Sequence, residues 1–144
     1  MDICSKLQSI EPQEGFYLLH TDNALIKLCF VTDEIVRIRA SFDKDLAEES
    51  YILLTTAWED RLDPLFAGER TRLTPVKAGL KETEDAVFFS TAEVTLRVDR
   101  DPLNFTLCDA DGNILYRALS GCPFVKDSNG RVIAYSEMKE DDCF

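Results

Sequence analysis

The 144-residue sequence has few of the features that accompany nucleic-acid, membrane or secretory roles. Its 16 Lys and Arg face 27 Asp and Glu, a formal net charge of −11. Because phosphate backbones are bound by clustered Lys and Arg, this balance argues against nucleic acid and anionic lipid as partners. No apolar run approaches the roughly 20 residues of a membrane helix. The N-terminus also lacks the basic-then-apolar order of a secretory signal. We therefore expect a cytoplasmic protein that binds neither nucleic acid nor membrane.

Histidine and closely spaced cysteine are equally scarce. His20 is the single histidine, and the five cysteines include no C-x-x-C pair. Zinc sites use such residues at such spacings, so we expect no metal and no cofactor. Cys29 and Cys108 lie in apolar, strand-like runs, where a free thiol packs as a small hydrophobic group. We interpret the cysteines as structural rather than as redox or metal-binding groups.

The sequence also lacks a long amphipathic helix, an internal repeat and a linker; residues 43–49 could hold a turn or two of helix at most. Instead it contains many short runs of strand character. These runs are residues 16–20, 24–31, 34–40, 51–56, 86–90, 93–98, 103–107, 113–118 and 131–138. Hairpin-type turns separate several of them, as at Asp111-Gly112 and at residues 128–130. Many short strands with frequent turns predict an antiparallel β-sandwich or barrel.

Several runs alternate with a period of two residues. Val36, Ile38 and Ala40 share one face, while the two arginines between them point the other way. The same alternation recurs over residues 93–98 and 103–107. A two-residue period is typical of strands with one buried face, so these apolar positions are expected to line the core.

No catalytic set stands out among the acids or around the histidine. Glycoside cleavage needs two carboxylates roughly 5–10 Å apart across a sugar, and the sequence singles out no such pair. The acidic clusters at residues 48–49, 82–85 and 140–142 are interpreted as solvated loops and ends. As a general base, His20 would need an orienting partner, which the sequence does not identify. We interpret it as an ordinary edge or partly buried histidine.

Residues 56–70 form the most unusual segment, with the only tryptophan among several charges. In one interpretation it is a binding loop: Trp58 covers the C–H face of a sugar, while Asp60 and Asp63 accept hydrogen bonds from hydroxyl groups. In the simpler interpretation, its apolar side chains fix the loop to the core and its ions pair locally. We name Trp58, Asp60 and Asp63 as candidate substrate-binding residues.

Residues 92–115 resemble the N-terminal β-sandwich domain of glycoside hydrolase family 31, the α-glucosidase family. There the family has two strands joined by a short polar-Pro turn, here Asp101-Pro102, followed by an Asp-x-x-Gly hairpin, here residues 109–112. Leu103 departs from the pattern, because the family often has Phe after that proline. The resemblance extends over nearly the whole chain.

This resemblance implies a galactose-mutarotase-like supersandwich. It implies that residues 1–144 form a single domain, the N-terminal fragment of a larger multidomain glycosidase. In the family, a (β/α)8 barrel supplies an aspartate nucleophile and an aspartate acid for retaining hydrolysis of terminal α-linked glucose. A Tyr-Gly-x-Gly-Glu motif precedes that barrel, and this sequence reaches Phe144 about where the motif would begin. We therefore assign no catalytic residue, and expect this fragment to be inactive alone.

The partners implied are that barrel and the α-glucoside or oligosaccharide substrate of the parent enzyme. The resemblance also suggests that the loop at residues 58–70 reaches the substrate entrance. Two other functions remain open. One is a self-contained carbohydrate-binding module. The other is a small sugar mutarotase, but mutarotases of this fold use His together with Glu, and a single His20 argues against that activity.

Overall fold

A computed structural model describes residues 1–46 and 76–138. Every regular element in these two ranges is a β-strand. The strands are β1 (Asp2–Cys4), β2 (Leu7–Gln13), β3 (Phe16–Thr21), β4 (Leu25–Phe30), β5 (Val36–Ser41), β6 (Gly79–Glu82), β7 (Ala86–Ser90), β8 (Val94–Arg100), β9 (Leu103–Asp109), β10 (Ile114–Arg117), β11 (Phe124–Lys126) and β12 (Val132–Ala134). Within the same ranges, no helix has the length and apolar character needed to cross a bilayer.

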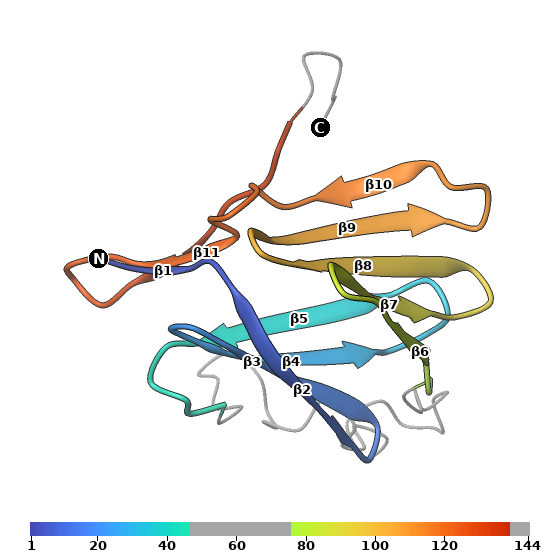
Figure 1. Ribbon diagram of the computed structural model, residues 1–144, viewed down its shortest axis with the longest axis horizontal. Coiled ribbons are helices and arrows are strands. Elements are labelled where there is room, and N and C mark those ends of the chain that lie inside the picture. Colours follow the sequence, from blue (N-terminus) through green and yellow to red (C-terminus); the bar gives the residue numbers. More distant parts are fainter. Residues whose placement is uncertain (47–75, 139–144) are drawn as a thin grey trace, which may run out of the picture.

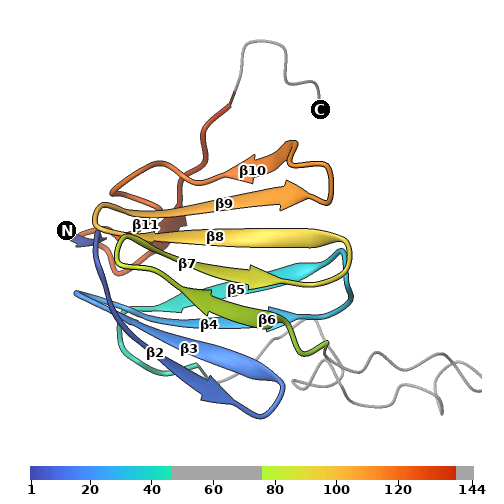
Figure 2. The same cartoon turned by 45° about the vertical axis from the view of Figure 1, so that its right-hand side comes forward.

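The strands form two larger sheets and a small one. One sheet has the order β2-β3-β4-β5, the second β10-β9-β8-β7-β6, and the small sheet β1-β11-β12. All strand pairs are antiparallel. Figures 1 and 2 show the two larger sheets as facing layers, with the small sheet at one end. The predicted all-β class and antiparallel β-sandwich are confirmed; the galactose-mutarotase-like subtype stays a prediction.

The core lies between the two larger sheets. Phe89 of β7 has no exposed surface. Its ring meets Tyr17 of β3 edge-on, with 4.8 Å between centroids, and lies 6.5 Å from Phe30 of β4. The Tyr17 hydroxyl donates a hydrogen bond of 2.8 Å to the carbonyl of Ala78, so its polar end is satisfied inside the core. These contacts join the two sheets across the sandwich.

The predicted alternation is confirmed on both sheets. The side chains of Val36, Ile38 and Ala40 in β5 pack against the core. Val94, Leu96 and Val98 of β8 are buried as well. In β9, Leu103 and Phe105 are buried and Leu107 packs against them, as the two-residue period requires.

A carboxylate fixes the corner between the small sheet and the four-stranded sheet. Asp22, in the turn between β3 and β4, accepts hydrogen bonds from the backbone N–H groups of Ser5, Lys6 and Asn23 and from the Ser5 hydroxyl. Partial burial alone would raise the pKa of Asp22, but these hydrogen bonds outweigh it and hold the pKa below its ordinary value. The chain between β1 and β2 is thereby tied to the β3–β4 turn.

Four strands were not predicted, and one is shorter than predicted. The four residues of β6 are all exposed at the edge of the five-stranded sheet, so they show no apolar period. Six of the seven residues of β2 are partly or fully exposed, because it is an edge strand rich in polar residues, so it shows no apolar period. β1 and β11 have three residues each, too few to show a period. The strand predicted at 131–138 is limited to β12, followed by a single bridge at Ser136.

Other predictions fall wholly or partly in the stretch that the structure leaves undescribed. The run at 51–56 lies outside the described residues. Of the 43–49 segment, residues 43–46 are described and form no helix.

Candidate functional site

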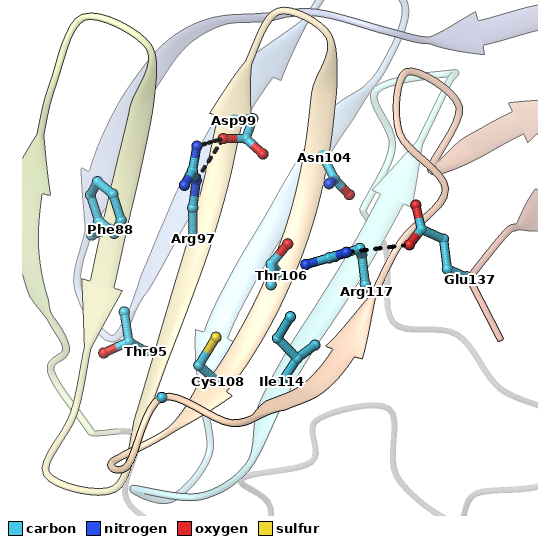
Figure 3. A pocket seen from close by; sticks show the side chains of 11 residues that line it. Phe88, Thr95, Arg97, Asp99, Asn104, Thr106, Cys108, Ile114, Arg117 and Glu137 are labelled. Atoms are coloured by element: carbon cyan, nitrogen blue, oxygen red, sulfur yellow. Dashed lines mark hydrogen bonds and ion pairs between the residues drawn. The ribbon is translucent and has the colours of Figure 1, made fainter. Parts of the chain in front are cut away.

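A pocket of about 490 Å³ opens on the outer face of the five-stranded sheet. Its side chains come from β7, β8, β9 and β10, and from Glu137 beyond the last strand (Figure 3). They are the outward-facing members of the same alternations whose inward members form the core. The sheet thus serves as a rigid platform for a polar surface.

One row of this surface crosses four strands. Phe88 lies opposite Arg97, Arg97 opposite Thr106, and Thr106 opposite Arg117. Directly opposed residues of antiparallel strands project from the same face, so the four side chains stand side by side. The guanidinium carbon of Arg97 lies 5.9 Å from the centre of the Phe88 ring. Thr106 is only 8% exposed, although it belongs to the outer face.

A bulge in β10 completes the row. The register with β9 shifts between Ile114 and Tyr116, so that Ile114 opposes Cys108 while Arg117 opposes Thr106. In a regular strand, residues three positions apart point to opposite faces. The extra residue of the bulge allows both Ile114 and Arg117 to line the pocket.

Two ion pairs and one side-chain amide also line the pocket. Both Nε and Nη2 of Arg97 lie 2.7 Å from Oδ1 of Asp99. Nη1 of Arg117 lies 3.7 Å from Oε2 of Glu137, within ion-pair range but too long for a hydrogen bond. Asn104 opposes Asp99 across the β8–β9 pair, and its Oδ1 is buried with no hydrogen-bond partner among the described residues.

The pocket therefore has two positive and two negative side chains. It also has hydroxyl groups from Thr95 and Thr106 and an amide oxygen that can accept a hydrogen bond. Phe88 and Ile114 add apolar surface. Such a set is suited to hydrogen-bonding a neutral ligand, because donors and acceptors are present together.

The sequence-predicted substrate residues are not part of what the structure describes. Trp58, Asp60 and Asp63, with the loop at 58–70, lie outside the described residues. Their role stays a prediction.

His20 is partly exposed, on the four-stranded sheet, and the structure gives it a partner that the sequence did not reveal. Its Nε2 lies 3.1 Å from Oε2 of Glu11, and both side chains are about half exposed. Glu11 belongs to β2, which was not predicted, so the pair could not be anticipated. Neither residue lines the pocket on the other sheet.

The cysteines divide into two environments. Cys4 and Cys29 are buried. Burial raises the pKa of the Cys4 thiol to about 11, and its Sγ lies 3.1 Å from the hydroxyl of Thr21. The expectation that Cys108 packs as a small hydrophobic group is wrong in one respect. It lies on the outer face of β9, is partly exposed and lines the polar pocket, because it shares a face with Asn104 and Thr106. Within residues 1–46 and 76–138, no three His, Cys, Asp or Glu side chains gather as a metal site.

The pocket itself was missed at the sequence level. Arg97, Asn104 and Thr106 were recognisable as polar members of alternating strands, but a pocket depends on which residues oppose one another across four strands. Registers between strands are set by the packed core and by the bulge, and neither can be read from one strand alone.

Solved structures with this fold include carbohydrate-active enzymes. A dextranase of glycoside hydrolase family 31 from Flavobacterium johnsoniae, in complexes with isomaltotriose and with glucose, matches with a TM-score of 0.76 and 17% identity. The match covers 98% of this chain and 16% of the dextranase. The cycloalternan-forming enzyme of Listeria monocytogenes, in complex with a pentasaccharide substrate, matches with a TM-score of 0.57 and 11% identity over 81% of this chain and 9% of that enzyme.

At these identities the likeness establishes the fold alone. Neither the protein-family models nor the curated proteins include a match to this chain. The chain spans 16% of the length of the dextranase that it matches.

Proposed function

We propose that this chain is a non-catalytic β-sandwich domain of a glycoside hydrolase related to family 31, and that it packs against a separate catalytic barrel. The observation that carries the proposal is the fold match to the dextranase, which includes nearly all of this chain but only 16% of the enzyme. The Asp101-Pro102 turn and the hairpin at residues 109–112 support the same relationship. On this proposal, residues 1–144 are one domain of a longer polypeptide.

The distribution of exposed apolar side chains supports an interface in the C-terminal half. Seven large hydrophobic residues with substantial exposure lie between residues 114 and 138. They are Ile114, Leu115, Tyr116, Leu119, Val132, Tyr135 and Met138. Several lie on paired segments, since the Leu119 N–H donates to the Tyr135 carbonyl and the Glu137 N–H to the Arg117 carbonyl. Apolar side chains gathered in this way are typical of a surface that another domain covers.

The reaction proposed for the parent is retaining hydrolysis of terminal α-linked glucose. In that reaction one carboxylate forms a glycosyl-enzyme intermediate, which water then cleaves. Both catalytic carboxylates would come from the barrel, and this domain would support it. The loop at residues 58–70, with Trp58, Asp60 and Asp63, would reach the substrate entrance. A cytoplasmic location is part of the same proposal.

The test is hydrolysis of an aryl α-glucoside by the purified 144-residue chain. We expect release of the aryl alcohol no faster than in buffer alone. A commercial α-glucosidase, assayed in parallel, shows that the substrate is competent. Turnover by the pure chain that survives repeated purification would contradict the proposal, because it would require a catalytic pair within these residues.

A sugar mutarotase is the weaker alternative. The His20–Glu11 pair supplies the two residue types that such an activity needs. The pair is half exposed and does not line the pocket described above, which argues against it. Anomer interconversion of glucose at the spontaneous rate in the presence of the chain would exclude this activity.

A further inference from the structure

We propose that the pocket on the outer face of the five-stranded sheet is a sugar subsite that binds one glucose unit of a neutral α-glucan chain. The choice of glucose rests on the proposed function, whereas the preference for a neutral, polyhydroxylated ligand rests on the pocket itself. Its described lining belongs to β7, β8, β9 and β10, with Glu137 beyond β12. It would hold a glucan chain on the domain without cleaving it.

The dimensions of the pocket fit one pyranose ring. Arg97 and Arg117 stand on either side of Thr106, with two strand spacings between them. Neighbouring strands lie about 4.8 Å apart, so the two arginine backbones are separated by about 10 Å. A single pyranose with its hydroxyl groups can span that gap. The volume of about 490 Å³ falls within the range of small-molecule pockets.

The charges of the pocket favour a neutral ligand over an anion. Arg97 is held by Asp99 through two contacts of 2.7 Å, so its charge is already balanced. Glu137 balances Arg117 at 3.7 Å, a distance that leaves the Arg117 guanidinium with donors for a ligand. A phosphate would meet both carboxylates in a chain of net charge −11. A sugar hydroxyl both donates and accepts, and can therefore use the arginines and the acids together.

Asn104 provides the strongest single indication of a ligand. Its Oδ1 lies buried in the pocket lining with no hydrogen-bond partner among the described residues. Buried polar atoms are nearly always paired in folded proteins, so an unpaired one in a pocket indicates a group that binds there. An acceptor oxygen needs a donor, and because Oδ1 is out of reach of solvent, a sugar hydroxyl would supply one once the Asn104 amide turns toward the pocket.

Apolar side chains at two edges complete the match. Phe88 lies at the β7 side of the pocket and Ile114 at the β10 side, as Figure 3 shows. The C–H groups of a pyranose can pack on such surfaces while its hydroxyls face the polar row. A ligand with only polar groups would make no apolar contact with these two side chains.

The proposal is tested by titrating the ¹⁵N-labelled 144-residue chain with isomaltotriose and recording amide chemical shifts. We expect saturable shifts, with a millimolar dissociation constant, confined to β7, β8, β9, β10 and the residues around Glu137. Inorganic phosphate at the same concentrations should leave these amides unmoved. No shifts at saturating isomaltotriose, shifts confined to other strands, or phosphate acting on the same amides more strongly than the sugar would each overturn the proposal.

Two variants and one control locate the site. Asn104→Leu and Arg117→Gln should each raise the dissociation constant at least tenfold. Arg131→Gln should leave it unchanged, because Arg131 is exposed in the β11–β12 hairpin and pairs with Asp127 away from the pocket. If both pocket variants bind like the control, the sugar does not occupy this pocket. The dispersion of the amide spectrum shows that each variant is folded, and Arg117→Gln alone decides the matter if Asn104→Leu does not fold.

The subsite and the proposed function are contradicted by different results. Loss of sugar binding would remove the subsite and leave the assignment as a glycosidase domain untouched. Hydrolysis by the isolated chain would contradict that assignment without affecting the titration of the pocket.

Discussion

Asn104 shows how one residue can reduce stability and still be suited to function. Its buried Oδ1 has no partner among the described residues, and an unsatisfied buried acceptor costs about 1–3 kcal/mol. It faces Asp99 across the β8–β9 pair, on the polar side of a strand whose other side packs against the core. Without a bound ligand, the chain would be more stable with an apolar side chain of similar shape at position 104.

We therefore predict that Asn104→Leu raises the free energy of unfolding by about 1 kcal/mol, since it removes the unpaired acceptor without removing volume. Urea denaturation followed by circular dichroism measures the change. Thr95→Val, at an outward position of the neighbouring strand, is the matched control. There the hydroxyl lies 3.0 Å from the Ser90 hydroxyl, so its removal should be neutral or destabilising. A less stable Asn104→Leu variant would indicate that the amide is satisfied.

Asp22 is predicted to govern part of the stability at acid pH. Its pKa is lower in the folded chain than in the unfolded chain, where the ordinary value is about 3.9. The unfolded state therefore binds more protons in this range. The contribution of Asp22 is fully present above the unfolded pKa and is lost as the pH falls through the folded pKa.

The measurement compares the melting temperatures of the wild type and Asp22→Asn from pH 6 to pH 2.5. The variant should be less stable at pH 6, and the two curves should converge toward pH 2.5. Asp33→Asn, in the next turn of the same sheet, controls for the general effect of removing a negative charge. A constant difference between wild type and Asp22→Asn across the range would disprove the role assigned to the ionised carboxylate.

At the scale of the elements, the β9–β10 hairpin depends on a glycine. Gly112 adopts a φ of +86°, and an added Cβ would meet no atom within 4 Å. A side chain there is therefore opposed by backbone conformation alone. Asp109 completes the turn by accepting hydrogen bonds from the backbone of Asp111 and Asn113.

Gly112→Ala should cost about 1–2 kcal/mol, the usual penalty for an L-residue in the left-handed region. Gly112→Asn should cost less, because asparagine tolerates that region better. Thermal melts of the two variants provide the comparison. Equal stability of Gly112→Ala and the wild type would show that the hairpin does not hold this backbone conformation in solution.

The sequence was informative where strands are long and half buried. In β5 and β8 the two-residue period predicted both the strand and its buried face, since Val36, Ile38, Val94 and Leu96 all pack inward. It was uninformative for β2, whose polar residues form a strand because they pair with β3 at the edge of the sheet. Pairing with another strand is a property of the fold, and no local sequence pattern predicts it.

The same limit applies to the candidate site. The polar residues of β8 and β9 could be assigned to an outer face, but the row from Phe88 to Arg117 exists only because four registers coincide and β10 contains a bulge. The pairing of Glu11 with His20 likewise depends on β2. Conversely, the sequence drew attention to Trp58, Asp60 and Asp63, which lie outside the described residues and whose role stays a prediction.

At the scale of the whole molecule, two regions of the surface are expected to bind different partners. The exposed hydrophobic residues between 114 and 138 suit contact with another domain. The pocket on the five-stranded sheet borders this region, because Ile114 belongs to both. A sugar held in the pocket would therefore lie close to the proposed domain interface.

The most direct test of the central claim is the mass of the natural polypeptide that contains this sequence. An antibody raised against the 144-residue chain, used on an extract of the source cells, would measure it. We predict a band several times heavier than 16.3 kDa, from a polypeptide that also contains the catalytic barrel. A single band at 16.3 kDa, in extracts protected from proteolysis, would contradict the account.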